Sequence, residues 1–140
     1  MLAWILAIFF FSTDSFSSSE TSRIIVPALK FLFPSLSPEH LQVAHVICRK
    51  AGHILEYLVL GVLAWRAFTA TPFVWIRPEF LTVALILAVA MSDEFHQSFV
   101  PSRTSALGDV GYDFFGGLMG LLLMLRLRNE PRTLPSHSVL

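Results

Sequence analysis

Two segments of this apolar chain place histidine and carboxylate side chains at helical spacing. His53 and Glu56 are three residues apart, and so are Asp93 and His96. Residues three or four apart lie on the same face of a helix, so each pair would present an imidazole and a carboxylate together. Such groups can transfer protons in catalysis, and two pairs on facing helices could also hold a metal ion.

A purely structural interpretation competes with both chemical ones. Buried charges are normally paired, so these side chains could form an ion-pair lattice that locks the helices together. The metal interpretation has the least support, because the chain has no HExxH motif and a single cysteine, Cys48. We therefore predict no metal and no cofactor. The sequence contains no nucleophile motif or phosphate-binding loop that would identify a reaction. If the two pairs are catalytic, the candidate residues are His53, Glu56, Asp93 and His96.

A second set of polar side chains could bind an anion. Arg49 and Lys50 precede the first pair and Arg103 follows the second, and a guanidinium binds phosphate through two parallel hydrogen bonds. Alternatively, these cations only neutralise nearby acids, and an aspartate at position 109 only caps a helix. The candidate ligand-binding residues are Arg49, Lys50, Tyr57, Glu94, Gln97, Arg103, Asp109 and Asp113.

The composition places these polar groups in a membrane protein. Of 140 residues, 54% are apolar and 14% are charged, and the mean hydropathy is +0.65. Soluble domains carry about a quarter charged residues. The formal net charge of zero gives no reason to expect nucleic acid as a partner. Ionisable groups in a membrane cost a few kcal/mol each, so several together indicate mutual neutralisation or function.

Four apolar segments are expected to be helices that position these side chains. They cover residues 1–11, 51–70, 79–97 and 108–127. The first is shorter than the roughly 20 residues that a span requires, and the others approach this length only with their polar ends included. We therefore predict an all-α, integral membrane four-helix bundle. In the last helix, Gly116 and Gly120 form a GxxxG motif, which favours close packing within the fold over dimerisation.

The connection between the first two helices is expected to contain short amphipathic helices on the membrane surface or over the bundle. Residues 12–22 are rich in serine and are interpreted as a polar loop. Three prolines, at positions 27, 34 and 38, argue against a continuous span after it. Ser37 and Pro38 form a favourable helix start.

The expected topology puts the polar pairs on one side of the membrane. Lys and Arg are evenly divided between the two sides of such a bundle, but the acids gather with the His–Asp pairs. We expect that side to face outward and both termini to be cytoplasmic. Residues 1–127 would form the membrane domain and residues 128–140 a polar cytoplasmic tail.

Three motifs make the chain similar to the VanZ-like family. They are RKAGHILEY at 49–57, DEFHQSFVPSR at 93–103 and DVGYDFFGGLMG at 109–120, with Ser102 where the family usually has glycine. These are small bacterial membrane proteins named for a glycopeptide (teicoplanin) resistance determinant. The resemblance implies a multi-pass protein of the bacterial inner (cytoplasmic) membrane.

We therefore predict a VanZ-like protein with an outward-facing polar pocket that binds or acts on an anionic cell-envelope lipid or lipid-linked precursor. The expected partner is a membrane lipid, with no nucleic acid. The alternative is a non-enzymatic membrane protein or small transporter whose polar cluster is a structural ion-pair lattice. The sequence does not show the inverted repeats and broken midplane helices that are expected of a transporter.

Overall fold

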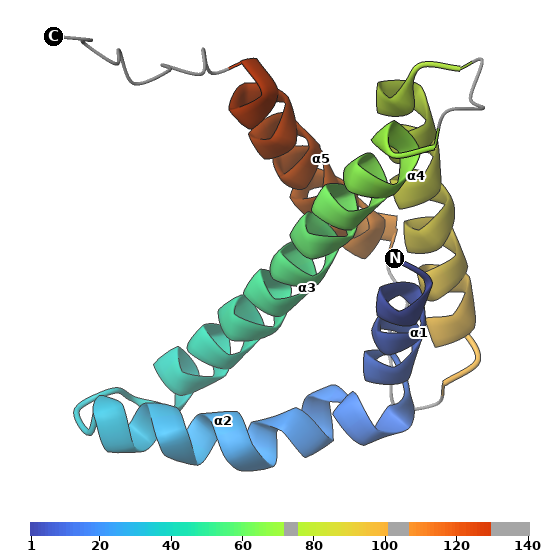
Figure 1. The fold of residues 1–140 in the computed structure, drawn as a ribbon. Coiled ribbons are helices and arrows are strands. Elements are labelled where there is room, and N and C mark those ends of the chain that lie inside the picture. The colour runs from blue at the N-terminus through green and yellow to red at the C-terminus, as the bar shows by residue number, and fades with distance from the viewer. Residues whose placement is uncertain (72–75, 101–106, 130–140) are drawn as a thin grey trace, which may run out of the picture.

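The computed structural model describes residues 1–71, 76–100 and 107–129, and the regular elements in these ranges are all helices. This confirms the predicted all-α class. Figure 1 shows five α-helices, with a short 3₁₀ helix, η1 (Asp14–Phe16), between the first two. The α-helices are α1 (Leu2–Phe11), α2 (Ser18–Leu32), α3 (Pro38–Thr69), α4 (Pro78–Gln97) and α5 (Leu107–Asn129).

The long helix α3 is the centre of the fold. It packs most extensively against α5, and α4 packs against both, while the short α1 contacts α3 and α4. The chain bends by 71° between α1 and the segment formed by η1 and α2. Helix α2 therefore crosses the end of the bundle and returns the chain to the start of α3 (Figure 1). The result is a three-helix bundle with an α1–α2 arm folded against it.

The predicted break between residues 50 and 51 is wrong, because α3 continues through this position. The predicted surface helix and the predicted second span are one continuous helix of 32 residues. No proline occurs between residues 39 and 71, so nothing in this stretch forces the helix to end. The predicted start is confirmed, because the Ser37 side chain accepts a hydrogen bond from the His40 backbone N–H and Pro38 occupies the first turn.

The interpretation of residues 12–22 as a polar loop is wrong. Ser17 is the N-cap of α2 and accepts from the Glu20 backbone N–H, so the serine-rich stretch supplies a helix start. Pro27 lies inside α2, and the helix ends only at Leu32, before Pro34. The predicted bounds of the other helices, 1–11, 79–97 and 108–127, agree with α1, α4 and α5 to within two residues.

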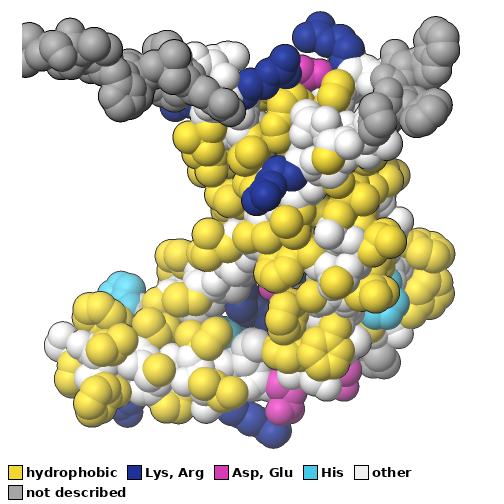
Figure 2. Space-filling view, in the orientation of Figure 1, with side chains coloured by type: hydrophobic (Ala, Val, Ile, Leu, Met, Phe, Trp, Pro, Cys, Tyr) yellow, Lys and Arg dark blue, Asp and Glu magenta, His cyan; other side chains and the backbone are white. Residues whose placement is uncertain are grey.

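Among the described residues, one helix, Gly108–Asn129, is long and apolar enough by itself to cross a membrane. The bent pair Leu2–Phe11 and Asp14–Leu32 passes the same test when taken together. The four predicted spans are thus reduced to one clear candidate. Large apolar side chains are nevertheless exposed on every α-helix, and they cover most of the face seen in Figure 2. Such a surface is suited to lipid or to a partner.

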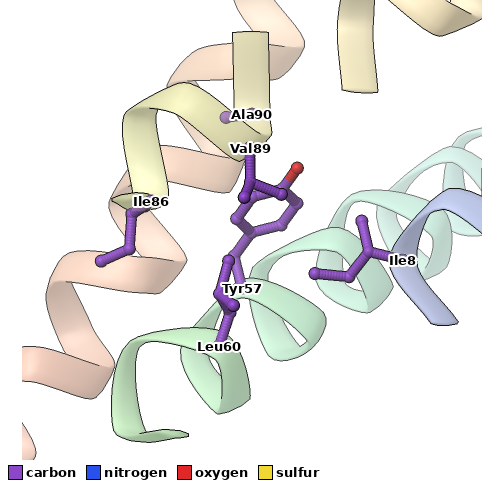
Figure 3. Packing of buried hydrophobic residues seen from close by; sticks show 6 residues of the cluster. All are labelled: Ile8, Tyr57, Leu60, Ile86, Val89 and Ala90. Carbon is purple, nitrogen blue, oxygen red and sulfur yellow. The ribbon is translucent and has the colours of Figure 1, made fainter. Parts of the chain in front are cut away.

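The apolar core lies where α1, α3 and α4 meet. Tyr57 and Leu60 of α3, Ile86 of α4 and Ile8 of α1 are almost completely buried and pack together (Figure 3). Val110 and Phe114 of α5 pack against this cluster. The core therefore holds four helices in a fixed arrangement around the polar groups next to it.

Glycines allow α5 to approach the backbone of α3 very closely. A Cβ at Gly116 would overlap the Ile54 carbonyl oxygen, and one at Gly120 would overlap the Leu58 carbonyl oxygen. Both carbonyls belong to the α3 backbone, so neither can rotate away as a side chain could. The GxxxG motif thus packs within the fold, as predicted.

We predict that Gly116→Ala destabilises the protein and that Gly111→Ala does not. Replacing a helical glycine by alanine gains up to about 1 kcal/mol of helix propensity. At Gly116 this gain is outweighed by overpacking, which typically costs about 1–3 kcal/mol. Gly111 is on the same helix, and a Cβ there meets no atom within 4 Å among the described residues. Thermal unfolding in detergent measures both variants, and equal melting temperatures would contradict the packing.

Candidate functional site

Three polar side chains from three helices converge beside the apolar core. They are His53 of α3, Asp93 of α4 and Asp113 of α5, and we call them the central polar cluster. His53 Nδ1 lies 3.1 Å from Asp113 Oδ1, and one potential metal-binding atom of each residue lies within 4.8 Å of the others. Both aspartates are 1% exposed. Two carboxylates are therefore held close together and away from solvent.

The packing of the helices explains this convergence. Asp113 lies one turn before Gly116, where α5 touches the α3 backbone at Ile54, the residue after His53. Asp93 lies one turn beyond the core residues Val89 and Ala90 on α4. The glycine contact and the apolar core thus bring the three polar side chains together.

Gln97, the last residue of α4, links the cluster to Ser12 at the end of α1. The Gln97 side-chain amide donates to Asp93 Oδ2 at 2.9 Å and to Ser12 Oγ, at the end of α1, at 3.3 Å. Among the described residues, the other Asp93 oxygen, Oδ1, has no hydrogen-bond partner, and neither does the buried Tyr57 hydroxyl. One oxygen of Asp93 is therefore fixed and the other is left to interact with something else.

A second ion pair lies next to the cluster and nearer the surface. Lys50 Nζ lies 3.0 Å from Asp109 Oδ1 and 4.0 Å from the ring centroid of Tyr112. About a third of each charged side chain in this pair is exposed. Lys50 and Asp109 therefore neutralise each other outside the cluster, as the structural alternative expected for the cations.

A hydroxyl group ties α2 to α3 on the other side of His53. Thr21 Oγ1 donates to the Ser17 carbonyl oxygen at 2.8 Å and accepts from Arg49 Nη1 at 3.1 Å. It also lies 3.2 Å from His45 Nε2, and because its hydrogen is already donated, His45 is the donor there. Arg49 Nη1 also donates to the Phe16 carbonyl oxygen at 3.2 Å. The arginine and the histidine are thus held in place by the α1–α2 arm.

A cavity of about 300 Å³ lies between the end of α1, η1, α2 and the middle of α3. Its walls combine apolar side chains, including Phe11, Phe16 and Ile25, with the polar side chains of Arg49 and His53. Further lining residues are Ser12, Thr21, Cys48, Gly52 and Glu56. In Figure 2 a hollow is visible beside α2, with a basic and a histidine side chain at its back. His53 therefore belongs both to the cavity wall and to the central polar cluster.

The remaining candidate residues are distributed around this site. The His96 ring packs edge-on against Phe9, with ring centroids 6.0 Å apart, and does not belong to the cluster. The Glu56 side chain lines the cavity, and its backbone carbonyl accepts from Trp4 Nε1 at 2.9 Å. Glu94 is buried. Arg103 lies outside the described residues and stays a predicted ligand-binding residue.

Sequence reasoning missed three residues of the site, Ser12, Thr21 and His45. The first two lie in the stretch that was expected to be a loop, and His45 was assigned to a surface helix separate from the second span. The four-residue spacing of Ser17, Thr21 and Ile25 is a helical signal that could have revealed the face of α2 directed at α3.

Comparison with known proteins identifies a family for the chain. A family model described as VanZ/LLP1 matches residues 1–128. No curated protein and no solved structure shows significant similarity to the chain.

We predict that His53→Ala destabilises the protein far more than Lys50→Ala. Removing His53 leaves the buried Asp113 carboxylate without its partner, and breaking a buried pair in this way costs about 3–5 kcal/mol. The partly exposed pair formed by Lys50 contributes about 0–1 kcal/mol. Unfolding of the two variants in detergent measures the difference in stability. Equal losses of stability would contradict the stronger burial of the His53–Asp113 pair relative to the Lys50–Asp109 pair.

We predict that His45 makes the folded protein less stable in mild acid. His45 lies near the start of α3, outside the helix that is long and apolar enough to cross a membrane. Burial of the ring, and to a smaller extent the nearby charge of Arg49, lowers the pKa of His45 below its ordinary value of 6.5. As the pH falls below 6.5, the unfolded chain binds a proton that the folded chain excludes, so stability falls until the lowered pKa is reached. His45→Gln should reduce the drop in melting temperature between pH 7.5 and pH 5.5, to be checked at those two values. The exposed His40→Gln is the control and should retain the wild-type drop.

Proposed function

The chain belongs to the VanZ/LLP1 family, and from this premise we propose that it is a multi-pass membrane protein that binds an anionic cell-envelope lipid or lipid-linked precursor. The binding site in this proposal is the cavity between α1, α2 and α3. The observation that carries it is the lining of that cavity, which places the Arg49 guanidinium, near the His53 ring and the Glu56 carboxylate, in a largely apolar wall.

The chemistry of the cavity suits an amphipathic anion. Arg49 is held at the wall by its bonds to Phe16 and Thr21, so its positive charge has a defined position. A fixed guanidinium recognises phosphate and carboxylate groups well. Phe11, Phe16 and Ile25 offer apolar surface to an acyl or prenyl chain on the same ligand. The volume lies at the lower end of the range for small-molecule sites, which fits a head group and the start of a chain.

The placement of α2 supports access from the membrane surface. This helix has charged residues, among them Glu20, Arg23 and Lys30, beside exposed apolar ones such as Ile24 and Phe31. An amphipathic helix of this kind lies at the boundary between head groups and acyl chains. The cavity beside it would then open at the depth where lipid head groups are found.

The orientation in this proposal puts the cavity at the outer leaflet of the bacterial inner membrane. The ends of α3 and α5 and the start of α4 carry Arg66, Arg126, Arg128 and Arg77 at the opposite end of the bundle. Lys and Arg are evenly divided between the two ends, but at the cavity end Arg49 and Lys50 are held by Thr21 and Asp109 and the acids gather, which favours the opposite end as cytoplasmic. Glycopeptide antibiotics act on envelope precursors at the outer face. A protein that retains such precursors there fits the teicoplanin resistance for which the family is named.

We predict that filling the cavity at Gly52 abolishes lipid retention without unfolding the protein. Gly52 lines the cavity, and a Cβ there meets no atom within 4 Å among the described residues, so Gly52→Leu projects into open space. Mass spectrometry of lipids that co-purify in mild detergent should show the anionic species of the wild type lost in this variant. Arg49→Lys should also weaken retention, because lysine keeps the charge but lacks the planar fork.

Gly111→Leu is the matched control for the leucine. It adds the same side chain at an exposed glycine of α5, outside the cavity, and should retain wild-type lipids. Drug susceptibility of cells that carry each variant provides the second measurement. Wild-type lipid retention by well-folded Gly52→Leu would contradict the cavity as the lipid-binding site.

A further inference from the structure

We propose that the central polar cluster is a binding site for one divalent transition-metal ion, of the Mn²⁺ or Zn²⁺ class. His53 supplies an imidazole nitrogen, and Asp93 and Asp113 each supply a carboxylate oxygen. The site adjoins the cavity, but it does not depend on what the cavity binds.

The positions of the three side chains are close to those that a metal requires. Ligands on neighbouring vertices of a tetrahedral or octahedral site with bonds of 2.0–2.2 Å lie about 2.8–3.6 Å apart. His53 Nδ1 and Asp113 Oδ1 are already 3.1 Å apart, and the whole set lies within 4.8 Å. Small side-chain rotations would therefore complete the geometry. The three ligands come from three helices, which fixes their backbones relative to one another.

The charge of the cluster favours a divalent cation. Two carboxylates at 1% exposure carry a charge of −2 when both are ionised, and a protonated His53 would offset only half of it. Lys50, the nearest described lysine on this face of α3, is paired with Asp109. A divalent ion bound by a neutral imidazole and two carboxylates would leave no net charge in the buried site.

Two buried polar atoms without hydrogen-bond partners among the described residues point to the same place. Gln97 fixes Asp93 through Oδ2 and leaves Oδ1, which is buried, without a donor. A hydrogen bond to the non-coordinating oxygen of a carboxylate is how proteins orient metal ligands. The Tyr57 hydroxyl, one helical turn after His53, is also buried and without a partner. In Figure 3 the Tyr57 side chain extends from α3 to the part of α4 that carries Val89 and Ala90, and Asp93 follows one turn later on α4. From there the hydroxyl could donate to a metal-bound water.

The donor types narrow the choice of ion. Mg²⁺ and Ca²⁺ prefer oxygen-only sites, whereas one imidazole with two carboxylates suits Mn²⁺, Fe²⁺ or Zn²⁺. The absence of a thiolate from the set disfavours the softer Cu⁺.

The experiment measures metal binding by the full-length chain in mild detergent, without added lipid. The protein is stripped with EDTA, dialysed against Mn²⁺ or Zn²⁺ and analysed by inductively coupled plasma mass spectrometry. The wild type should retain about one ion per chain with a raised melting temperature, and Asp93→Asn and Asp113→Asn should lose most of it. Asp109→Asn, one turn from Asp113 but outside the cluster, is the matched control and should bind like the wild type.

A spectroscopic measurement on the wild type decides the outcome even where the variants do not fold. Bound Mn²⁺ should show electron spin echo modulation from one ¹⁴N nucleus of the His53 ring. Wild-type protein that retains no stoichiometric Mn²⁺ or Zn²⁺, Mn²⁺ without nitrogen modulation, or an equal loss of metal in Asp109→Asn would each overturn the site. Because the added metal ions are counted directly, this result does not depend on whether Gly52→Leu loses or keeps its lipids.

Discussion

The polar chemistry of this protein depends on how closely the backbones of α3 and α5 approach each other. Gly116 and Gly120 bring α5 into direct contact with the carbonyl groups of α3, with no side chain between them. Asp113 is one turn from this contact and is therefore delivered to His53 at 3.1 Å. Helices separated by larger residues, at the usual 8–10 Å, would leave more room between these two groups. The glycines thus determine a distance between functional side chains as well as a packing contact.

The α1–α2 arm completes what the three-helix bundle begins. Through Ser12 it reaches Gln97, and through Thr21 it positions Arg49 and His45. The same arm forms the outer wall of the cavity, whereas His53 forms part of its inner wall. The two buried aspartates come from α4 and α5, whereas much of the cavity lining comes from the arm. The polar cluster and the cavity are therefore built by different parts of the fold and share His53 of α3.

The sequence predicts the local features of this fold better than the relations between its parts. The apolar runs and the Ser37–Pro38 start were sufficient to predict α1, α4 and α5 and the beginning of α3, since these depend on short-range patterns. The continuity of α3 was missed because Arg49 and Lys50 were taken to mark the boundary between a surface helix and the span that starts at residue 51. Both residues are nevertheless good helix formers. The helical state of Ser18 to Thr21 was missed because the serine-rich composition was interpreted as a loop, although Ser17 caps this helix and Thr21 contacts His45, 24 residues further along the chain. Within the site, spacing indicated which residues share a face, but only the fold pairs His53 with Asp113 and separates it from His96.

The continuous helix α3 also has a mechanical consequence. Its 32 residues extend over about 48 Å, whereas the hydrocarbon core of a bilayer is about 30 Å thick. In the proposed multi-pass arrangement, a helix of this length would project from the bilayer or tilt strongly, and it crosses the bundle obliquely in Figure 1. Its first turns are tied to α2 and its middle carries His53, so one continuous helix links the α1–α2 arm to the buried carboxylates. A tilt of α3 relative to α2 would therefore change the wall of the cavity and the position of His53 together, because one rigid helix carries both.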